Sequence, residues 1–408
     1  MKILMVNKFF YLKGGSEGVF FDEAELLKNK AHEVVFFSMN DERNFPTGYS
    51  RYFITNIDYK DTKTFQGKIK GGLDILYSLE AKKKMEALLR YEKPDIAHLH
   101  NIHHQISPSI LDVLVKYKIP TVMTLHDYKL VCSSYYMLLD GKPCERCKNG
   151  KYYQCFINKC TKNSYLKSLT NTIEMYLHHK ILHIYDVIDV FISPSRFLKE
   201  KLKEMGFKRE IVYLPNFIDT KDYELEYDFN ERTICYFGRL SQEKGLFTLL
   251  EAIKGVNAEF KVIGEGPLKE SLESKVKNEG LVNVEFLGYK SGEELRNEVK
   301  NSMIIVLPSE WYENNPIAVL EVFALGKPVI GSRIGGIPEL IKDNETGLTF
   351  EPGNSKNLIE KILYLSHNPD EAVEMGRNAR KFVEKNFNPE KHYQRLMEIY
   401  QMALERHK

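Results

Sequence analysis

The stretch "SMIIVLPSEWYENNPIAVLEVFALGKPVIGSRIGG", residues 302–336, contains the sequence signals of a strand, a helix and a second strand. An apolar, β-branched run ends at Ser309, Pro316 starts the expected helix, and Gly326 stands where that helix stops. A second apolar run follows directly. This order predicts a βαβ unit, whose parallel strands are buried on both faces.

Short apolar runs alternate with helical patterns along the rest of the chain as well. Before residue 216 the runs are "KILMVN", "HEVVFFS", "PDIAHLH", "PTVMTLHD", "VIDVFISPS" and "IVYLPN". After residue 231 they are "ICYFGRL", "EFKVIGEG", "VEFLGY", "SMIIVLPS", "KPVIGSRIGG" and "GLTFEPG". Candidate helices lie between them, for example at 16–30 and 107–117. We therefore predict the α/β class, with two doubly wound, Rossmann-like domains.

The polar, acidic segment at 216–233 separates the two series and is predicted to be a linker. A chain of 408 residues favours two domains over one, because a typical domain has about 150 residues. We predict an N-terminal domain at 1–215 with a cysteine-rich insertion at 132–160, and a C-terminal domain at 216–385. A final amphipathic helix, within 386–408, is expected to pack back on the first domain.

The composition is that of a soluble globular protein, with 43% hydrophobic and 28% charged residues. The formal net charge of +2 gives no general reason to expect a nucleic-acid partner. The first apolar run is too short for a signal peptide, and none reaches the roughly 18 to 20 residues of a membrane span, so we expect a cytoplasmic protein. A two-lobed solute-binding protein, an alternative interpretation, would call for a secretion signal.

Two basic segments bear on membrane contact: "QGKIKGG" at 66–72 and "EAKKKMEALLR" at 80–90. They leave peripheral contact with the inner face of a membrane open. A solvated helix face is the simpler interpretation of both, because lysine-rich faces are common at ordinary protein surfaces.

Loops that follow strands are the expected place for function, because doubly wound sheets bind ligands beyond the carboxyl ends of their strands. In "YFGRLSQEKG", Arg239 and Lys244 follow the run that ends at Phe237. Two cations at the start of a helix suit a diphosphate, although an ordinary solvated turn could have the same sequence. Gly264 in "VIGEGP" could let the backbone approach a nucleotide, or could simply form a tight turn.

Two glutamates follow the strand at 302–309. Glu313 lies just before the helix, and Glu321 lies about one and a half turns inside it, among apolar side chains. A buried carboxylate costs on the order of 2 to 7 kcal/mol unless donors satisfy it. The two hydroxyls of a nucleotide's ribose would satisfy Glu321, and a lysine or backbone amide at a domain interface is the alternative.

The first half of the chain supplies a matching set. Gly14 and Gly15 follow the first strand and precede a helix that we expect Ser16 to cap. Such a helix N-terminus accepts anions. His126 stands at the end of the fourth strand and could contact a substrate hydroxyl, unless it is merely a polar strand end.

These segments together resemble a known family. Glu313 and Glu321 form an "E-x7-E" pattern, which is accompanied by "FGRLSQEKG", "VIGEGP", "ETGLTFEPGN" and the N-terminal "GGSE". The chain resembles the retaining GT-B glycosyltransferases of glycosyltransferase family 4 over nearly its whole length, with the motifs in the same order. The resemblance implies a GT-B fold whose C-terminal domain binds a nucleotide-diphosphate sugar.

The resemblance also implies roles for residues of the C-terminal domain. Arg239 and Lys244 would neutralise the diphosphate. Glu321 would accept hydrogen bonds from the ribose, and Glu313 would contact the donor sugar. The remaining donor-binding residues of this domain would be Gly264, Asn314, Asn315 and Pro316.

In the N-terminal domain, Gly14 and Gly15 would approach the donor phosphate, and His126 would touch the donor sugar. The predicted catalytic residues are then His126, Glu313, Arg239 and Lys244. No Asp-x-Asp occurs in the chain, so the carboxylate pair that commonly holds a divalent metal on a sugar nucleotide is missing. We expect no catalytic metal, and the cations and helix N-termini would stabilise the leaving diphosphate. Retention is explained in this family by front-face attack, in which the leaving phosphate takes the acceptor's proton.

We expect a glycosyltransferase that moves a sugar from a UDP or GDP sugar to a glycan or polyprenol-linked acceptor in cell-surface polysaccharide biosynthesis. Many relatives have "EGFG" where this chain has "ENNP" at 313–316, so the sequence selects neither the sugar nor the nucleotide. A sugar-nucleotide epimerase or a phosphorylase on the same fold is the alternative.

Five cysteines gather in the insertion, at Cys132, Cys144, Cys147, Cys155 and Cys160. Disulfides are rare in cytoplasmic proteins, so the spacing C-x2-C-x7-C-x4-C predicts a structural zinc ion bound by the last four. Reduced, metal-free thiols are the alternative. Because lysines crowd the cysteines, a zinc-cluster nucleic-acid-binding protein is a rival from another class, which the near-neutral total charge disfavours.

Overall fold

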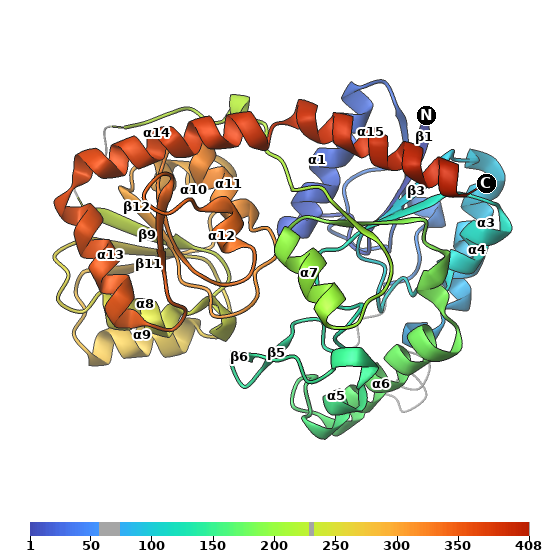
Figure 1. Cartoon of the computed structure of the whole chain (residues 1–408), viewed down its shortest axis with the longest axis horizontal. Coiled ribbons are helices and arrows are strands. Elements are labelled where there is room, and N and C mark those ends of the chain that lie inside the picture. Colours follow the sequence, from blue (N-terminus) through green and yellow to red (C-terminus); the bar gives the residue numbers. More distant parts are fainter. Residues whose placement is uncertain (57–73, 228–231, 408) are drawn as a thin grey trace. The chain divides into compact units, whose positions relative to one another are not determined.

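The structure, a computed structural model, describes residues 1–56, 74–227 and 232–407 (Figure 1). The basic segment at 66–72 and residues 228–231 of the predicted linker lie outside the described residues. The chain divides into two compact units. Unit 1 consists of Met1–Met137, Glu145–Pro215 and His392–Lys408, and unit 2 consists of Leu138–Cys144 and Asn216–Lys391.

Unit 1 is built on a parallel sheet in the order β2-β1-β3-β4-β7-β8. Its strands are β1 (Lys2–Val6), β2 (Glu33–Phe37), β3 (Ile96–Leu99), β4 (Thr121–Thr124), β7 (Val190–Ser193) and β8 (Ile211–Tyr213). Nearly all of their side chains are buried, as expected for strands covered by helices on both faces. The strand order reverses between β1 and β3, and doubly wound sheets bind ligands at such a switch point.

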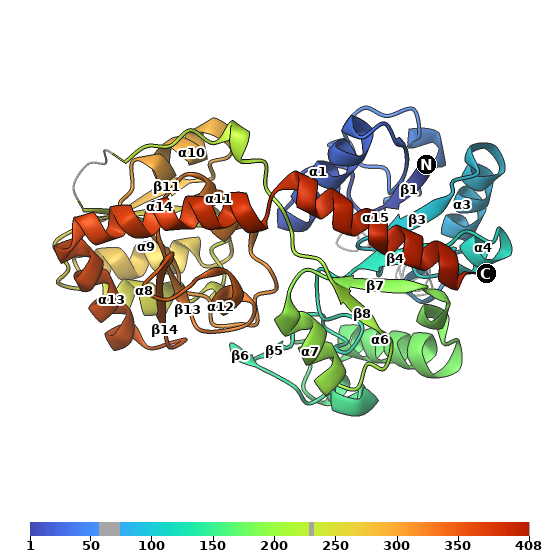
Figure 2. The ribbon, with the colours of Figure 1, turned by 45° about the horizontal axis from the view of Figure 1, so that its top comes forward.

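Helices of unit 1 surround this sheet. They are α1 (Gly15–Asn29), α3 (Leu79–Glu92), α4 (Ile110–Lys116) and α7 (Arg196–Glu204), joined by the end of α15 (Pro389–Arg406). Figure 2 shows α15 running across the strands of this sheet, and its residues Leu396, Ile399 and Tyr400 are buried in one core with Ile3 and Met5. The last helix of the chain therefore completes the core around the first strand.

Unit 2 has a second parallel sheet, in the order β11-β10-β9-β12-β13-β14. Its strands are β9 (Thr233–Phe237), β10 (Glu259–Ile263), β11 (Val284–Gly288), β12 (Ile304–Leu307), β13 (Val329–Ser332) and β14 (Gly347–Phe350). Its helices are α8 (Leu246–Ala252), α9 (Lys269–Asn278), α10 (Gly292–Lys300), α11 (Ile317–Ala324), α12 (Ile337–Leu340), α13 (Ser355–His367) and α14 (Pro369–Asn386). The order reverses between β9 and β12, which places a second switch point there.

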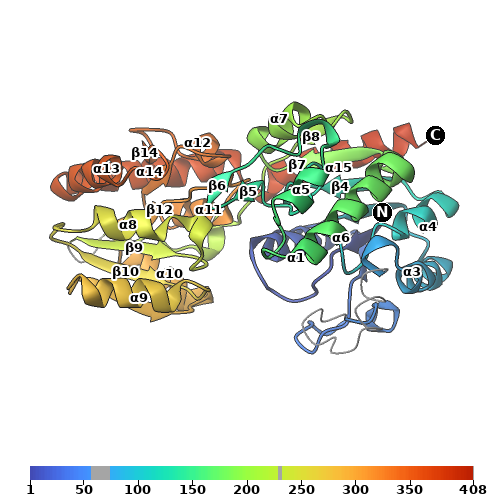
Figure 3. The same cartoon turned by 90° about the horizontal axis from the view of Figure 1, so that it is seen from below.

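The cysteine-rich insertion has little regular structure. It contains a hairpin of β5 (Leu138–Leu139) and β6 (Lys142–Pro143), followed by α5 (Tyr153–Ile157). After the insertion comes α6 (Tyr165–Tyr176), which continues as a π-helix at Leu177–Ile181. Helices α5 and α6 lie side by side (Figure 3). Across the described parts of the chain, no helix combines the length and the apolar character needed to cross a bilayer.

The predicted α/β class with two Rossmann-like sheets is confirmed, and every one of the twelve predicted strands forms. The expected helix at 107–117 is shorter, at Ile110–Lys116. The expectation that Ser16 caps the first helix is wrong. Gly14 is the N-cap, with an extended backbone, and the Ser16 hydroxyl inside the helix instead donates to Glu17 Oε1 at 3.2 Å.

Candidate functional site

The switch point of unit 2 brings together the loops after β9 and β12. The backbone N–H of Glu310 donates to the carbonyl of Glu243 at 2.9 Å, which joins the two loops. Gly245 has a φ of +68°, and a Cβ there would lie 1.8 Å from the carbonyl oxygen of Pro308. Only glycine therefore permits this close approach of the loops.

The loops meet in an ion pair between two residues predicted from the sequence. Lys244 Nζ lies 2.6 Å from Glu313 Oε1, and the Ser309 hydroxyl donates to the same oxygen at 2.7 Å. Burial raises the pKa of Glu313, but the charge and hydrogen bond of Lys244, with that of Ser309, hold it below its usual range. Glu313 is therefore an ionised carboxylate at neutral pH, and it forms an ion pair with Lys244.

Asn315 stands next to this pair with its amide unused by the protein. The side chain is 6% exposed, and within the described parts of the chain neither Oδ1 nor Nδ2 has a hydrogen-bond partner. Its backbone carbonyl accepts from Asn216 Nδ2 at 3.0 Å, which fixes the position of the residue. A buried amide without partners costs about 1 to 3 kcal/mol, so this one is poised to bind a polar ligand.

Arg239 and Gly264 lie in neighbouring loops. The side chain of Arg239 is exposed, while its carbonyl accepts from the Tyr236 hydroxyl at 2.9 Å. Gly264 has a φ of +139°, and a Cβ on it would lie 1.9 Å from the carbonyl oxygen of Gly238. Packing of the loops alone therefore requires this glycine, and its predicted contact with a nucleotide stays a prediction.

The expectation that Glu321 is buried is wrong. Helix α11 begins after Pro316, as predicted, and buries Val319, Leu320 and Val322, but Glu321 is only half-buried. The apolar neighbours of Glu321 in the sequence did not indicate that it lies at the edge of the buried face of the helix. An orphaned carboxylate in the core is therefore not the reason for this residue, and its contact with a ribose stays a prediction.

The switch point of unit 1 has a different character. Helix α1 opens at Gly15, where a Cβ would meet no atom within 4 Å. Beneath this opening Glu17 is buried, and burial raises the pKa of its carboxyl group. The start of α1 thus offers open backbone at Gly15, close in sequence to a buried carboxyl group whose pKa burial raises.

His126 follows β4 and packs against a second histidine. Its Nε2 lies at hydrogen-bond distance, 2.9 Å, from Nδ1 of His100, and the two rings are stacked. Burial lowers the pKa of His126 to about 4, so the ring is neutral at pH 7. Because His100 occupies Nε2, Nδ1 is the nitrogen that His126 can offer to a substrate.

A buried polar group lies behind this pair. Glu23, His98 and His100 have ligand atoms within 4.8 Å of one another, the only set of three metal-ligating side chains that close in the described residues. The protein itself engages His98: Nδ1 lies 3.1 Å from Glu23 Oε1 and 2.8 Å from the Tyr400 hydroxyl. Sequence reasoning missed this group, although two histidines two residues apart on a strand must share a face of the sheet.

Comparison with known proteins identifies the family. The model of "Glycosyltransferase Family 4" matches residues 13–222, and that of "Glycosyl transferases group 1" matches residues 218–382. The chain belongs to glycosyltransferase family 4. It is a GT-B glycosyltransferase, as the resemblance of its sequence motifs implied.

Relatives of this glycosyltransferase match over most or part of its length. An uncharacterised glycosyltransferase of Methanocaldococcus jannaschii is 26% identical, with 98% of both chains covered. The amylovoran biosynthesis glycosyltransferase of Erwinia amylovora is 30% identical over 52% of this chain and 56% of its own. The structure of Anabaena HepE in complex with UDP-glucose has a TM-score of 0.67 and 17% identity, with 98% of this chain and 99% of that chain covered.

None of the six cysteines of this glycosyltransferase forms a disulfide in the structure. A hydrogen bond from Cys160 lowers the pKa of Cys155 to about 6 and raises that of Cys160. Cys144, a predicted zinc ligand, belongs to the segment of unit 2 that carries the hairpin, while Cys147 belongs to unit 1. Zinc at these cysteines stays a prediction, which metal analysis of the purified protein would test.

Proposed function

We propose that the protein is a retaining glycosyltransferase that binds a nucleotide-diphosphate sugar at the β9/β12 switch point of unit 2. The observation that carries this proposal is the buried amide of Asn315, which has no partner among the described residues, next to the ion pair of Lys244 and Glu313. Protein groups already satisfy the carboxylate, whereas the amide has no partner among the described residues, and the exposed Arg239 is able to reach a ligand. A sugar with several hydroxyls and a diphosphate supplies both kinds of partner.

The charges of these residues suggest which part of the ligand each of them would bind. Arg239 and Lys244 would bind the diphosphate, Glu321 would accept from the ribose hydroxyls, and Asn315 with Glu313 would hold the sugar. When the diphosphate binds, it competes with Glu313 for Lys244, so the lysine can follow the charge that develops on the leaving oxygen. Stabilising that charge is commonly worth about 2.7 to 4 kcal/mol for one well-placed donor.

The proposed reaction needs no metal and no enzyme nucleophile. The bond between the anomeric carbon and the diphosphate oxygen breaks, and the acceptor oxygen bonds to that carbon on the same face of the sugar. The acceptor's proton passes to the diphosphate oxygen, which balances the charges. His126, neutral at pH 7, would hold a sugar hydroxyl and exchange no proton.

The acceptor in this proposal is a growing glycan or a polyprenol-linked sugar, in the biosynthesis of a cell-surface polysaccharide at the cytoplasmic side of the membrane. The name of the Erwinia amylovora relative supports this class of acceptor. The UDP-glucose complex of HepE supports a nucleotide sugar as donor, and a UDP sugar is the first to try.

Proton NMR during slow hydrolysis of the donor tests the proposal. With EDTA present and an α-linked donor sugar, the first free sugar released should be the α anomer, because a retaining enzyme keeps the configuration. Initial release of the β anomer would contradict retention. Loss of all turnover in EDTA, restored by a divalent metal, would contradict metal-independent catalysis.

A further inference from the structure

Helix α6 buries mainly polar side chains and exposes apolar ones, unlike an ordinary surface helix. The side chains it buries are polar apart from Met175, namely Ser168, Asn171, Thr172 and Glu174. The side chains it exposes include Leu166 at 73%, Tyr165 at 54% and Ile173 at 46%. A surface helix normally turns its apolar stripe toward the core and its polar face toward water, so α6 has the reverse pattern.

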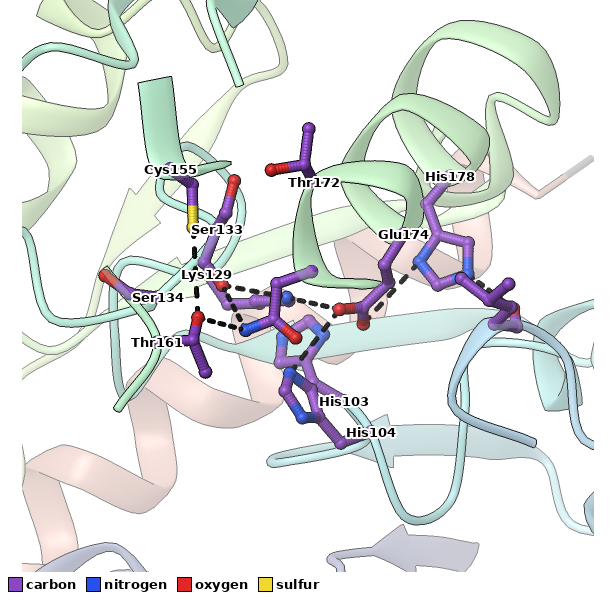
Figure 4. A network of polar contacts seen from close by, with 12 residues as sticks. His103, His104, Lys129, Ser133, Ser134, Cys155, Thr161, Thr172, Glu174 and His178 are labelled. Carbon is purple, nitrogen blue, oxygen red and sulfur yellow. Dashed lines mark hydrogen bonds and ion pairs between the residues drawn. The ribbon is translucent and has the colours of Figure 1, made fainter. Parts of the chain in front are cut away.

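The polar face is held by a buried network, which Figure 4 shows from close by. Glu174 Oε2 lies 2.7 Å from Lys129 Nζ, and both side chains are almost fully buried. Asn171 Nδ2 donates to Thr161 Oγ1 at 3.0 Å and to the Ser133 carbonyl at 3.2 Å. These contacts attach the polar face of α6 to unit 1, and Met175 is buried with it. The exposed apolar side chains of α6 take no part in them and are left for another role.

Helix α5 extends the apolar surface. Phe156 and Ile157 are 36% and 58% exposed, and the ring of Phe156 lies 5.5 Å from that of Tyr165 on α6. Leu169, 38% exposed, adds to the face formed by α6. We call Phe156, Ile157, Tyr165, Leu166, Leu169 and Ile173 the α5–α6 surface.

The segment that forms the α5–α6 surface carries mostly positive charges. Between residues 146 and 182 the sequence has seven lysines and arginines and a single acidic residue, Glu174. Lys162, Lys167 and Lys180 are exposed, whereas Glu174 is buried in its network. Lys159 places its ammonium 4.5 Å from the centre of the Tyr165 ring, so cations and apolar groups are interleaved. The solvent-facing charge of this region is therefore positive.

We propose that the α5–α6 surface docks on an anionic lipid bilayer. Apolar side chains that enter the boundary between headgroups and acyl chains, flanked by cations that meet anionic headgroups, are what binding in the plane of a membrane requires. A nucleic acid would use the cations but not the exposed Leu166 and Ile173. The inference stands apart from the proposed chemistry, because it involves no donor-binding residue, and it would bring the enzyme to a lipid-linked acceptor.

Cosedimentation with vesicles tests this proposal. The full chain should bind vesicles of phosphatidylcholine with phosphatidylglycerol more tightly than vesicles of phosphatidylcholine alone. The double variant Leu166→Gln/Ile173→Gln should weaken binding by about tenfold or more, because two apolar side chains no longer leave water. Lys162→Ala/Lys167→Ala should weaken binding to the anionic vesicles by about tenfold and remove most of its salt dependence.

Val282→Gln is the matched control, since Val282 is 99% exposed in unit 2 and lies outside the α5–α6 surface. It should bind vesicles like the wild type. The wild type failing to bind anionic vesicles, or the Leu166/Ile173 double variant binding them normally, would overturn the proposal. So would a wild-type dimer that this double variant dissociates while neither protein binds vesicles, because a second copy would then cover the surface. Binding of single-stranded RNA that only the lysine variant loses, without vesicle binding, would also overturn it.

Discussion

The two switch points occupy the same place in two similar sheets, yet the candidate residues near them differ in charge: those of unit 2 are ionised, and His126 of unit 1 is neutral. At the switch point of unit 2, Lys244 keeps the buried Glu313 ionised. Beside that of unit 1, after β4, burial keeps His126 neutral, and the group it contacts is a second imidazole, that of His100. The topology of a doubly wound sheet thus fixes where a site lies, and the partner of each buried group decides whether that site offers charge or neutral hydrogen bonds.

The largest effect is expected from removing the charge at the unit 2 switch point. Lys244→Ala should lower kcat by about 10²- to 10³-fold, since it removes one group proposed to stabilise the leaving diphosphate. It also leaves Glu313 buried and unpaired, which lowers the free energy of unfolding. The double variant Lys244→Ala/Glu313→Gln should recover stability in urea unfolding but not turnover. Wild-type turnover in Lys244→Ala would remove the contrast between the two switch points.

The effect of removing the proposed contact between Glu321 and the ribose comes next in size. Glu321→Gln should weaken nucleotide binding by about 1 to 3 kcal/mol, because a charged acceptor is lost. Since Glu321 is half-buried, its substitution should leave the free energy of unfolding nearly unchanged. Glu360→Gln, on the exposed side of α13, is the control, and calorimetry with the free nucleotide measures both. Equal affinities of the two variants would leave Glu321 without its proposed role.

Asn315→Leu separates ligand binding from folding at the same switch point. Because the amide has no partner among the described side chains and backbone groups, an apolar residue of similar shape should raise the free energy of unfolding, by about 1 kcal/mol. Affinity for the nucleotide sugar should fall, while affinity for the nucleotide alone should not. A variant that is destabilised and binds both ligands normally would show that the amide serves the fold.

The neutral state of His126 predicts that the stability of the protein depends on pH. The pKa of His126 is about 4 in the folded protein and about 6.5 in an unfolded chain, so the unfolded state binds more protons between these values. This stabilising contribution is complete above about pH 6.5 and is lost as the pH falls toward 4. Urea midpoints at pH 7.5 and 5 should therefore differ less in His126→Gln than in the wild type. An unchanged difference would mean that His126 is not held neutral.

The smallest effect concerns the hydrogen bond between the histidines. His100→Asn can keep a polar nitrogen near the position of Nδ1, whereas His100→Leu cannot. The leucine variant should alter the nitrogen NMR signals of His126, and the asparagine variant should restore them in part. His103→Leu removes a buried histidine bonded to the Tyr185 hydroxyl instead, and it should leave these signals in place.

Sequence patterns predicted the sheets well, because each strand is a local apolar run bounded by turn residues. They also selected Lys244 and Glu313, but not their contact, because 69 residues of chain separate the two and only the fold brings the loops together. The bond between His98 and Tyr400 spans 302 residues and escaped prediction for the same reason. Helix α6 shows a further limit, since its polar face is buried through a partner, Lys129, that is distant in sequence.

Calorimetric titration of UDP and GDP sugars in the presence of EDTA tests the central claim most directly. The wild type should bind one of them with micromolar affinity, and Lys244→Ala/Glu313→Gln should bind it at least about tenfold more weakly while it remains folded. Failure of the wild type to bind any nucleotide sugar, or equal binding by both proteins, would contradict a donor site at the switch point of unit 2.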